Sequence, residues 1–307
     1  MRIVFMGTPD IACSILNACY RSRNEIVGVV SQPDAQVGRG KKIRFSPVKE
    51  FALEKGLHLM QPEKVKNNTE FFEELKALNP DILVVCAYGR ILPKEILELP
   101  KYGAVNVHAS LLPKLRGASP IQSAILLGEE KTGITIMQMA EGLDSGDMIL
   151  KEEIEIGRMN HEELYNALTE IGERLIQEAL LLIDMGKATF EKQNEAEATY
   201  VTTISKADGK IDFTKEPVQI ERQIRAFDPW PGAYASLNDV VFKFWKADIS
   251  ERTGRTGEIL EANANGITVA CGNGSIVVKE LQVPGKKRVA VKDFLLGNKV
   301  NVGDLFV

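Results

Sequence analysis

The pattern of apolar and polar positions changes partway along the 307-residue chain. In the first part, short apolar runs typical of buried strands alternate with segments that have helical spacing. This alternation predicts βαβ units and a mostly parallel sheet with helices on both faces. The runs cover residues 2–7, 25–31, 57–62, 81–89 and 104–110, and the helical patterns cover residues 11–20, 69–78 and 119–128.

Two features close this first region. Residues 134–156 have the pattern of two strands joined by a loop that contains Gly and Asp. A long helix is expected over residues 162–184, with Asn160 as its N-cap and Gly186 at its end. Its apolar stripe comprises Leu164, Leu168, Ile171, Leu175 and Leu182. We therefore expect a first domain over residues 1–186.

Residues 187–203 are polar and poor in aliphatic side chains, so we expect a linker there. After a short helical pattern at residues 217–227, closely spaced strand patterns follow one another with Gly and Asn turns. Such strands without intervening helices predict a small antiparallel barrel over residues 204–307. The predicted fold class is therefore α/β, with a Rossmann-like, mostly parallel sheet domain followed by a small antiparallel, OB-like β-barrel domain.

Composition narrows the functional classes. A formal net charge of −4 argues against a protein that coats nucleic acid or anionic membrane by bulk charge, so any such contact needs a local basic patch. The four cysteines form no CxxC pair, which predicts neither a metal site nor disulfides and favours a reducing compartment. We see neither a targeting segment nor an apolar run that could span a membrane. We expect a cytoplasmic, monomeric protein.

The candidate chemistry lies at the end of the run at residues 104–110. The period of two places Asn106 and His108 on one face, at the carboxyl end of a strand, which is where ligands bind in open α/β sheets. A carboxamide and an imidazole can stabilise an oxyanion and move protons, but they need a carboxylate to orient the imidazole. Asp144 in the loop after residue 138 is the best candidate, and Asp147 is the alternative.

The remaining histidines and glycines indicate less. His58 and His161 are expected to be solvated residues without a functional role. The sequence GTPD, from Gly7, follows the first strand without the spacing of a dinucleotide-binding fingerprint, and a P-loop motif is absent. Nicotinamide binding and phosphate binding by a P-loop are therefore disfavoured.

The segments NVHASLLPKLRGASPIQ, from Asn106, and GLDSGDM, from Gly142, resemble the formyltransferase family that uses 10-formyltetrahydrofolate. The resemblance implies a catalytic triad of Asn106, His108 and Asp144 and no metal. It also implies that folate binds at the SLLP signature and beside the pterin pocket at YGRILP. The corresponding residues are Ser110, Leu111, Leu112 and Pro113 in the first motif and Arg90, Ile91 and Leu92 in the second.

A third segment narrows the acceptor. Residues 31–52 resemble the insertion that marks the branch of this family acting on methionyl initiator tRNA, whose basic loop meets the acceptor end of the tRNA. A run of charge is also typical of a solvated loop, and only the resemblance favours RNA. The match continues through residues 225–233 into the predicted barrel. The expected tRNA-binding residues are Arg39, Lys41, Lys42 and Arg44 in the loop and Lys286, Lys287 and Arg288 in the barrel.

The predicted function is transfer of a formyl group from 10-formyltetrahydrofolate to the α-amino group of methionyl initiator tRNA, which supports translation initiation. Formyl transfer to an amino-sugar nucleotide and hydrolysis of formyl-folate need the same triad, and the basic loop argues against them. A non-catalytic RNA-binding protein on an inactive formyltransferase scaffold is a further alternative. The presence of Asn106, His108 and Asp144 argues against that alternative.

Overall fold

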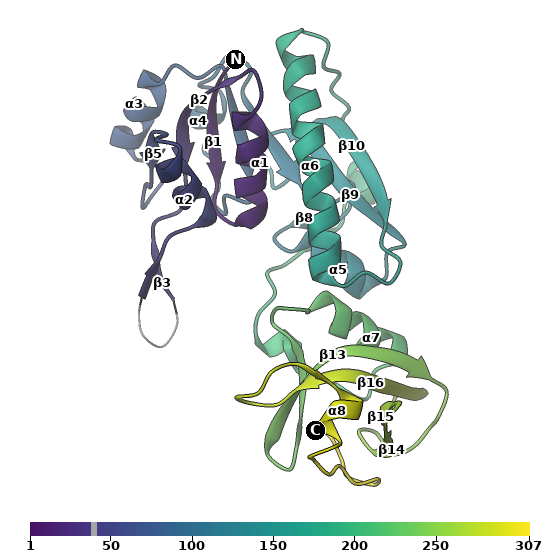
Figure 1. Ribbon diagram of the computed structural model, residues 1–307. Helices are drawn as coiled ribbons and strands as arrows, with labels where there is room; N and C mark the ends of the chain where they lie inside the picture. Colours follow the sequence, from purple (N-terminus) through teal and green to yellow (C-terminus); the bar gives the residue numbers. More distant parts are fainter. Residues whose placement is uncertain (38–41) are drawn as a thin grey trace. The chain divides into compact units, whose positions relative to one another are not determined.

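The computed structural model describes residues 1–37 and 42–307 and divides the chain into two compact units (Figure 1). The first unit consists of Met1–Pro120, Lys131–Glu155 and Tyr165–Val201. The second consists of Ile121–Glu130, Ile156–Leu164 and Thr202–Val307.

The first unit is built on a seven-stranded sheet with the order β10-β9-β7-β6-β1-β2-β5. The first five strands in the chain to join it run parallel to one another, β9 is antiparallel to β7, and β10 is antiparallel to β9. This arrangement confirms the mostly parallel sheet that the apolar runs predict. The strands are β1 (Arg2–Gly7), β2 (Glu25–Val30), β5 (Leu59–Met60), β6 (Ile82–Cys86), β7 (Ala104–His108), β9 (Lys131–Gln138) and β10 (Met148–Glu155).

Helices cover both faces of this sheet (Figure 1). On one face, α3 (Thr69–Ala77) and α4 (Lys94–Leu97) bury apolar side chains against β1, β2 and β6. On the other face lie α1 (Asp10–Tyr20), which contacts α2 (Pro47–Glu54), and α6 (His161–Asp184). Helix α6 packs closely on β7 and β9, because a side chain at Gly172 would meet Val107 and Ile134.

The long helix begins as the sequence predicts. The Asn160 side chain accepts a hydrogen bond from the Glu163 amide, and the Glu163 carboxylate accepts one from the Asn160 amide, which is a capping box. Helix α5 (Pro120–Leu127) likewise starts with proline at its first position.

Several short elements were not predicted. Strands β3 (Ala35–Val37) and β4 (Lys42–Arg44) pair as a hairpin within a segment expected to be a flexible loop. Helix α2 follows it, and its N-cap is Ser46, whose hydroxyl accepts a hydrogen bond from the Lys49 amide. That Ser-Pro start is a helix signal in the sequence, but the run of basic residues before it is also typical of a solvated loop.

The polar segment expected to be a linker packs on the first unit as far as Val201. Glu191 forms paired backbone hydrogen bonds with Met148 at the start of β10. After the short helix η1 (Glu195–Glu197), β11 (Tyr200–Val201) pairs in parallel with β8 (Arg116–Gly117). A polar composition therefore marks backbone pairing and side-chain contacts here, and the second unit takes up the chain from Thr202.

The second unit contains the predicted antiparallel sheet, with strand order β12-β13-β16-β15-β14 and β17 beside β16. The carboxyl terminus closes it into a barrel. Asp304 and Phe306 exchange backbone hydrogen bonds with the strand region at β14, and Val307 exchanges two with Ser236 of β12. The strands are β12 (Ala233–Leu237), β13 (Val240–Ser250), β14 (Ile259–Asn263), β15 (Gly266–Cys271), β16 (Gly274–Gln282) and β17 (Val289–Ala290).

The barrel core is apolar, and one face of a helix contributes to it. Helix α7 (Pro217–Ala226) buries Ile220 and Ile224 against it, and the short helices η2 (Ala207–Gly209) and α8 (Val291–Phe294) flank the sheet. Phe306 contributes from the last residues, with its ring edge against Phe244. None of the helices in the described residues is long and apolar enough to cross a membrane.

Candidate active site

Strand β7 brings Asn106 and His108 to one edge of the first unit. The strand is hydrogen-bonded on both sides, to β6 and to β9, so its position is fixed by the centre of the sheet. Val107 points towards α6, and the alternation of a strand therefore turns its two neighbours to the opposite face. Both side chains are almost buried, with 9% of Asn106 and 6% of His108 exposed.

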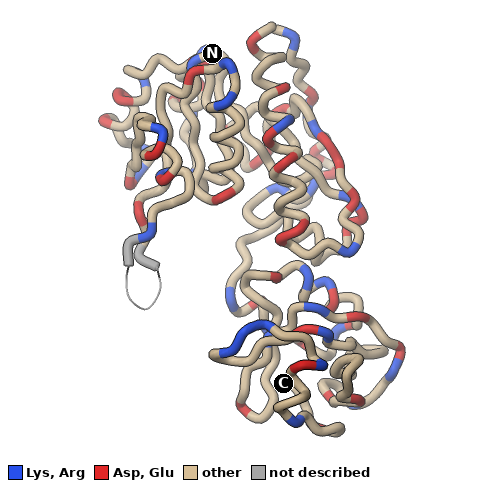
Figure 2. Tube along the Cα trace, viewed as in Figure 1, with Lys and Arg blue, Asp and Glu red and all other residues tan. Residues whose placement is uncertain are grey.

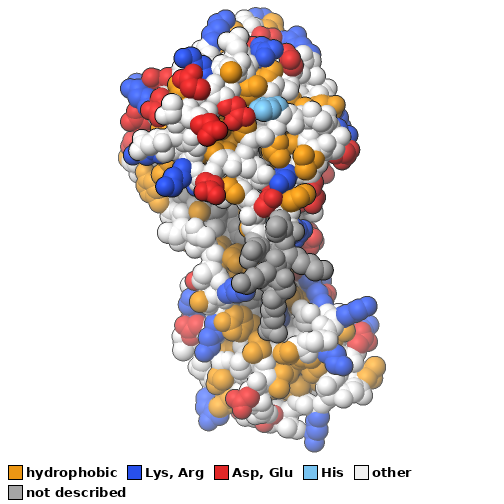
Figure 3. Space-filling model, turned by 90° about the vertical axis from the view of Figure 1, so that its left-hand side faces the viewer, with side chains coloured by type: hydrophobic (Ala, Val, Ile, Leu, Met, Phe, Trp, Pro, Cys, Tyr) orange, Lys and Arg blue, Asp and Glu red, His pale blue; other side chains and the backbone are white. Residues whose placement is uncertain are grey.

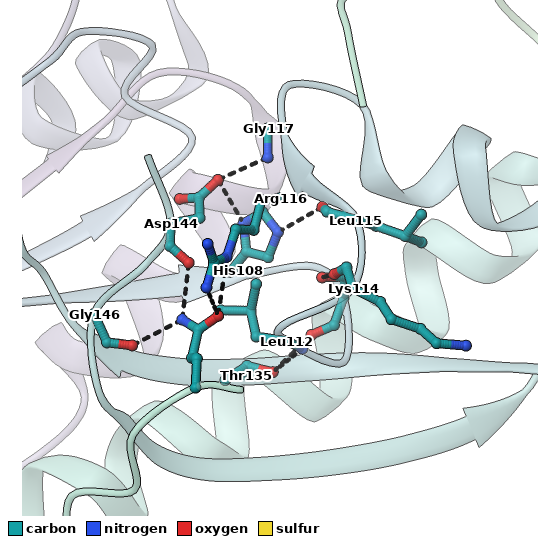
Figure 4. A network of polar contacts seen from close by, with 11 residues as sticks. His108, Leu112, Lys114, Leu115, Arg116, Gly117, Thr135, Asp144 and Gly146 are labelled. Carbon is teal, nitrogen blue, oxygen red and sulfur yellow. Dashed lines mark hydrogen bonds and ion pairs between the residues drawn. The ribbon is translucent and has the colours of Figure 1, made fainter. Parts of the chain in front are cut away.

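The imidazole of His108 lies between two acceptors (Figure 4). Its Nε2 is 3.1 Å from the Leu115 carbonyl oxygen, and its Nδ1 is 3.6 Å from a carboxylate oxygen of Asp144. A neutral imidazole can donate at one of these nitrogens, whereas an imidazolium can donate at both. Each ring nitrogen of His108 thus faces an oxygen that can accept a hydrogen bond.

Asp144 lies in the loop between β9 and β10, as the spacing predicts. Its carboxylate accepts a hydrogen bond of 2.8 Å from the Gly117 amide on the same side as His108. Asp144 has a φ of +49°, in the left-handed region that side chains other than glycine rarely adopt. Asp147 lies at the β10 end of the loop, where its carbonyl accepts from the Gln138 amide. Of the two loop carboxylates, Asp144 is the one that faces the imidazole.

The carboxamide of Asn106 is available to a ligand. Within residues 1–37 and 42–307, its side chain forms no hydrogen bond, although only 9% of the residue is exposed. Its amide is not among the fully buried polar groups that lack a partner, so it remains accessible at the strand end. It is therefore a donor that substrate can use at the strand end.

The segment Ser110–Pro113, expected to bind folate, leaves β7 directly after His108. The Thr135 hydroxyl holds its backbone by donating to the Ser110 carbonyl and accepting from the Leu112 amide. Ser110 and Leu112 are themselves buried, Ser110 with its hydroxyl donating to the Lys114 carbonyl. These two side chains support the loop beside His108, while Leu111 and Pro113 are partly exposed.

The second expected folate segment follows β6. The Arg90 guanidinium donates to the Glu63 carbonyl, and Leu92 is buried in the core under α3 and α4. Ile91 lies between them and is 84% exposed. An apolar side chain so exposed is the one in this segment that is free to contact a ligand.

A cavity of about 730 Å³ is lined in part by residues of the β9–β10 loop. It shares that loop with Asp144 but is lined by none of the residues expected to bind folate or by His108. Its lining includes Leu97, Tyr102, Gln138, Met139 and Glu141.

The basic loop residues are placed only in part. Arg39 and Lys41 lie outside the described residues, and Lys42 is placed only as backbone in β4. Arg44 is exposed at the end of β4. Lys49 forms an ion pair of 2.7 Å with Asp34, so its charge is already engaged. Over the face shown in Figure 3, basic and acidic side chains are interspersed.

The three basic residues of the barrel differ from one another. Lys286 and Lys287 are exposed in a turn before β17. Along the trace of this unit, basic residues alternate with acidic ones (Figure 2). Arg288 instead forms ion pairs with Asp228 at 2.8 Å and Glu280 at 2.7 Å, and it lies over the Trp245 ring. Since Asp228 is only 2% exposed, Arg288 compensates a buried charge in this unit.

The expectation that His161 is solvated was wrong. Its ring is largely buried at the start of α6, and burial lowers the pKa of His161 to about 4. The position in the first turn of a helix suggested exposure, whereas the residue is only partly exposed. His58 is exposed as expected and lies 2.9 Å from Glu74.

Sequence reasoning missed the residues behind Asp144. Arg116 is 1% exposed, and its guanidinium binds Gln193, Glu195 and Tyr200, all from the segment expected to be a linker. An arginine in a Gly- and Pro-containing stretch carries no sequence signal of burial. In the described part of the chain, no group of three or more His, Cys, Asp or Glu residues is placed to hold a metal.

Comparison with known proteins defines the class. The model of the formyl transferase family matches residues 1–180, and that of the formyl transferase C-terminal domain matches residues 203–299. The chain belongs to the formyl transferase family. It is 46% identical to a methionyl-tRNA formyltransferase of Clostridioides difficile and 45% identical to one of Caldanaerobacter subterraneus, with 99% of each chain covered in both comparisons.

Solved structures share the fold at lower identity. An N-formyltransferase from Helicobacter canadensis, solved with folinic acid and dTDP-3-aminofucose, is 21% identical with a TM-score of 0.67, covering 90% of this chain and 98% of that chain. HypX from Aquifex aeolicus in complex with tetrahydrofolic acid is 17% identical with a TM-score of 0.62, covering 99% of this chain and 50% of that chain. At this identity the likeness supports the fold alone.

Proposed function

We propose that the protein transfers a formyl group from 10-formyltetrahydrofolate to the α-amino group of methionyl initiator tRNA. The observation that carries the proposal is the Asn106–His108–Asp144 arrangement at the end of β7, in a chain 46% identical along its length to a methionyl-tRNA formyltransferase. The folate ligands of the structural neighbours support a folate as the formyl donor.

The proposed reaction is direct acyl transfer. The amine nitrogen forms a bond to the formyl carbon, the bond from that carbon to the folate nitrogen breaks, and one proton passes from the amine to the folate nitrogen. Protonated His108 and the Asn106 carboxamide donate hydrogen bonds to the oxygen of the tetrahedral intermediate, where negative charge develops. No covalent enzyme intermediate is required.

Asp144 stabilises the positive charge on His108 during this step. Its Oδ2 lies 3.6 Å from Nδ1, and the Gly117 amide donates a hydrogen bond to the same oxygen. The carboxylate also accepts or relays the proton that leaves the attacking amine. Asn106 and His108 thereby bind the oxyanion, and Asp144 orients His108 and balances its positive charge.

We assign tRNA binding to the basic residues outside this site. Arg39, Lys41, Lys42 and Arg44 would contact the acceptor end, and Lys286 and Lys287 would contact backbone phosphates. Arg288 is already engaged in two ion pairs, so we assign it the structural role of holding the turn that carries the two lysines. Affinity for tRNA should therefore fall as salt concentration rises.

One assay tests the proposal against its alternatives. Formyl-folate with a labelled formyl group is supplied with charged initiator tRNA, charged elongator tRNA, an amino-sugar nucleotide or water alone. We expect label in the methionyl ester of initiator tRNA. Label in the amino sugar or in free formate would overturn the acceptor, and no folate-dependent turnover would leave an RNA-binding protein.

A further inference from the structure

The loop that carries Asp144 is anchored from outside the strand that carries His108. Gln193 lies in the segment after α6, 49 residues beyond Asp144 in the chain. Its Nε2 donates two hydrogen bonds of 2.8 Å, one to the Asp144 carbonyl and one to the Gly146 carbonyl. Both protons of the amide are thus used to hold the two ends of one turn.

The turn needs such an anchor. Asp144 has left-handed backbone geometry, which is unfavourable for a residue with a side chain and persists only where the surroundings impose it. Gly146 has no room for a side chain, because a Cβ there would overlap the Gln138 carbonyl oxygen. The conformation that turns the Asp144 carboxylate towards His108 is therefore fixed by its neighbours.

The other end of Gln193 is held in turn by Arg116. The Gln193 Oε1 accepts from Nε and Nη2 of Arg116 at 3.0 and 2.8 Å. The fully buried guanidinium also binds the Glu195 carboxylate through two hydrogen bonds and the Tyr200 hydroxyl. The side-chain hydrogen bonds with Glu195 raise the pKa of Arg116, so it stays charged and its five donors keep a fixed geometry.

Arg116 also precedes the residue that grips the carboxylate. The Gly117 amide donates a hydrogen bond to the Asp144 carboxylate. Arg116 and Gly117 together form β8, which pairs with β11. A side chain at Gly117 would strike the Val201 carbonyl, so the two strands pack without a gap. The segment from Gln193 to Val201 therefore fixes both the loop carbonyls and the amide that binds the carboxylate.

We infer that Gln193 is a positioning residue for formyl transfer: bridging the Arg116 guanidinium and the Asp144 turn, it holds the Asp144 carboxylate against His108. This inference rests on the proposed function of that site. Gln193 touches no reacting atom, and its effect passes through the conformation of Asp144.

The decisive variant is Gln193→Glu. It has the same shape and can still accept from Arg116, but it offers two carboxylate oxygens and no N–H to the two loop carbonyls. We expect kcat to fall about 10- to 100-fold, as for a loss of preorganisation, with KM values changed by less than about threefold. Gln193→Asn, one methylene shorter, should have the same effect if Gln193→Glu folds poorly, because its amide cannot span both partners.

The Gly117 amide gives a readout independent of activity. It is protected by its hydrogen bond to Asp144, so its hydrogen exchange, followed by NMR in the free protein, should accelerate at least about tenfold in Gln193→Glu. The matched control is Asn194→Ala in the same segment, whose side chain donates to Glu197 and accepts from the Ala196 amide. We expect that variant to keep the parent kcat and the parent exchange rate.

Parent-like kcat and parent-like Gly117 exchange in both Gln193 variants would overturn the inference. Equal losses in Asn194→Ala would also overturn it, because they would indicate a general requirement for the segment. If the parent protein itself transferred no formyl group, the proposed function would fail, while Gly117 exchange would still test the positioning of Asp144.

Discussion

The regions around His108 and His161 both bury an imidazole, but they place it in different surroundings. His108 is held between the Leu115 carbonyl and the Asp144 carboxylate at the end of a central strand. His161 lies at the start of α6 in the other unit, where burial lowers the pKa of the ring to about 4. Burial by itself removes the proton from a histidine, and a facing carboxylate is what allows a buried histidine to carry charge.

The largest effect is expected from His108→Ala. Loss of the charged oxyanion donor, together with the group that Asp144 orients, should lower kcat about 1000-fold, with a much smaller change in KM. Steady-state kinetics with charged initiator tRNA measure this. The control is His58→Ala, an exposed histidine of the same unit, which should stay within about twofold of the parent. Near-normal turnover in His108→Ala would contradict the proposed site.

His161 should show itself in the pH dependence of stability. The unfolded chain protonates this histidine near pH 6.5 and the folded chain only near pH 4, so the unfolded state binds more protons between these values. Its contribution is therefore complete above pH 6.5 and is lost as the pH falls towards 4, by about 3 kcal/mol in total.

His161→Gln removes this titration. Denaturant unfolding at pH 7 and at pH 4.5 should show a smaller loss of stability on acidification in the variant than in the parent. Identical pH dependence in the two proteins would mean that His161 is protonated in the folded state and that the contrast with His108 does not hold.

Asp144→Asn tests whether the carboxylate makes the difference between the two histidines. The amide oxygen can still accept from Gly117, but the negative charge beside Nδ1 is gone. We expect kcat to fall about 100-fold with the fold intact. Asp147→Asn is the matched control on the same loop and should retain most of the activity. If Asp147→Asn lost more activity than Asp144→Asn, the carboxylate that supports His108 would be that of Asp147.

The smallest effects concern charge outside both histidine regions. Arg288→Met leaves Asp228 buried with less compensation and should lower the free energy of unfolding by about 1–2 kcal/mol.

The double variant Lys286→Ala, Lys287→Ala should keep its stability, raise KM for tRNA a few-fold and flatten the salt dependence of binding. Thermal melts and tRNA titrations at two salt concentrations separate the two outcomes.

The strength of the sequence signals differs from element to element. The strands at β1, β6 and β7 and the helix α6 were predictable because their periodicity and caps are local properties. The hairpin of β3 and β4 was missed because three-residue strands carry too little pattern. The pairing of β8 with β11 was missed because it joins residues more than eighty positions apart and contains two residues on each side.

The sequence by itself determined the alternating α/β pattern, the barrel strands and the shared face of Asn106 and His108, since each follows from periods of two or 3.6 residues. Tertiary structure decided that the Asp144 carboxylate faces His108, left His161 only partly exposed and paired Arg288 with Asp228. It also turned an apparent linker into the support of the Asp144 turn. These outcomes depend on contacts between distant residues, and the distances and burial that decide charge and hydrogen bonding exist only once the chain has folded.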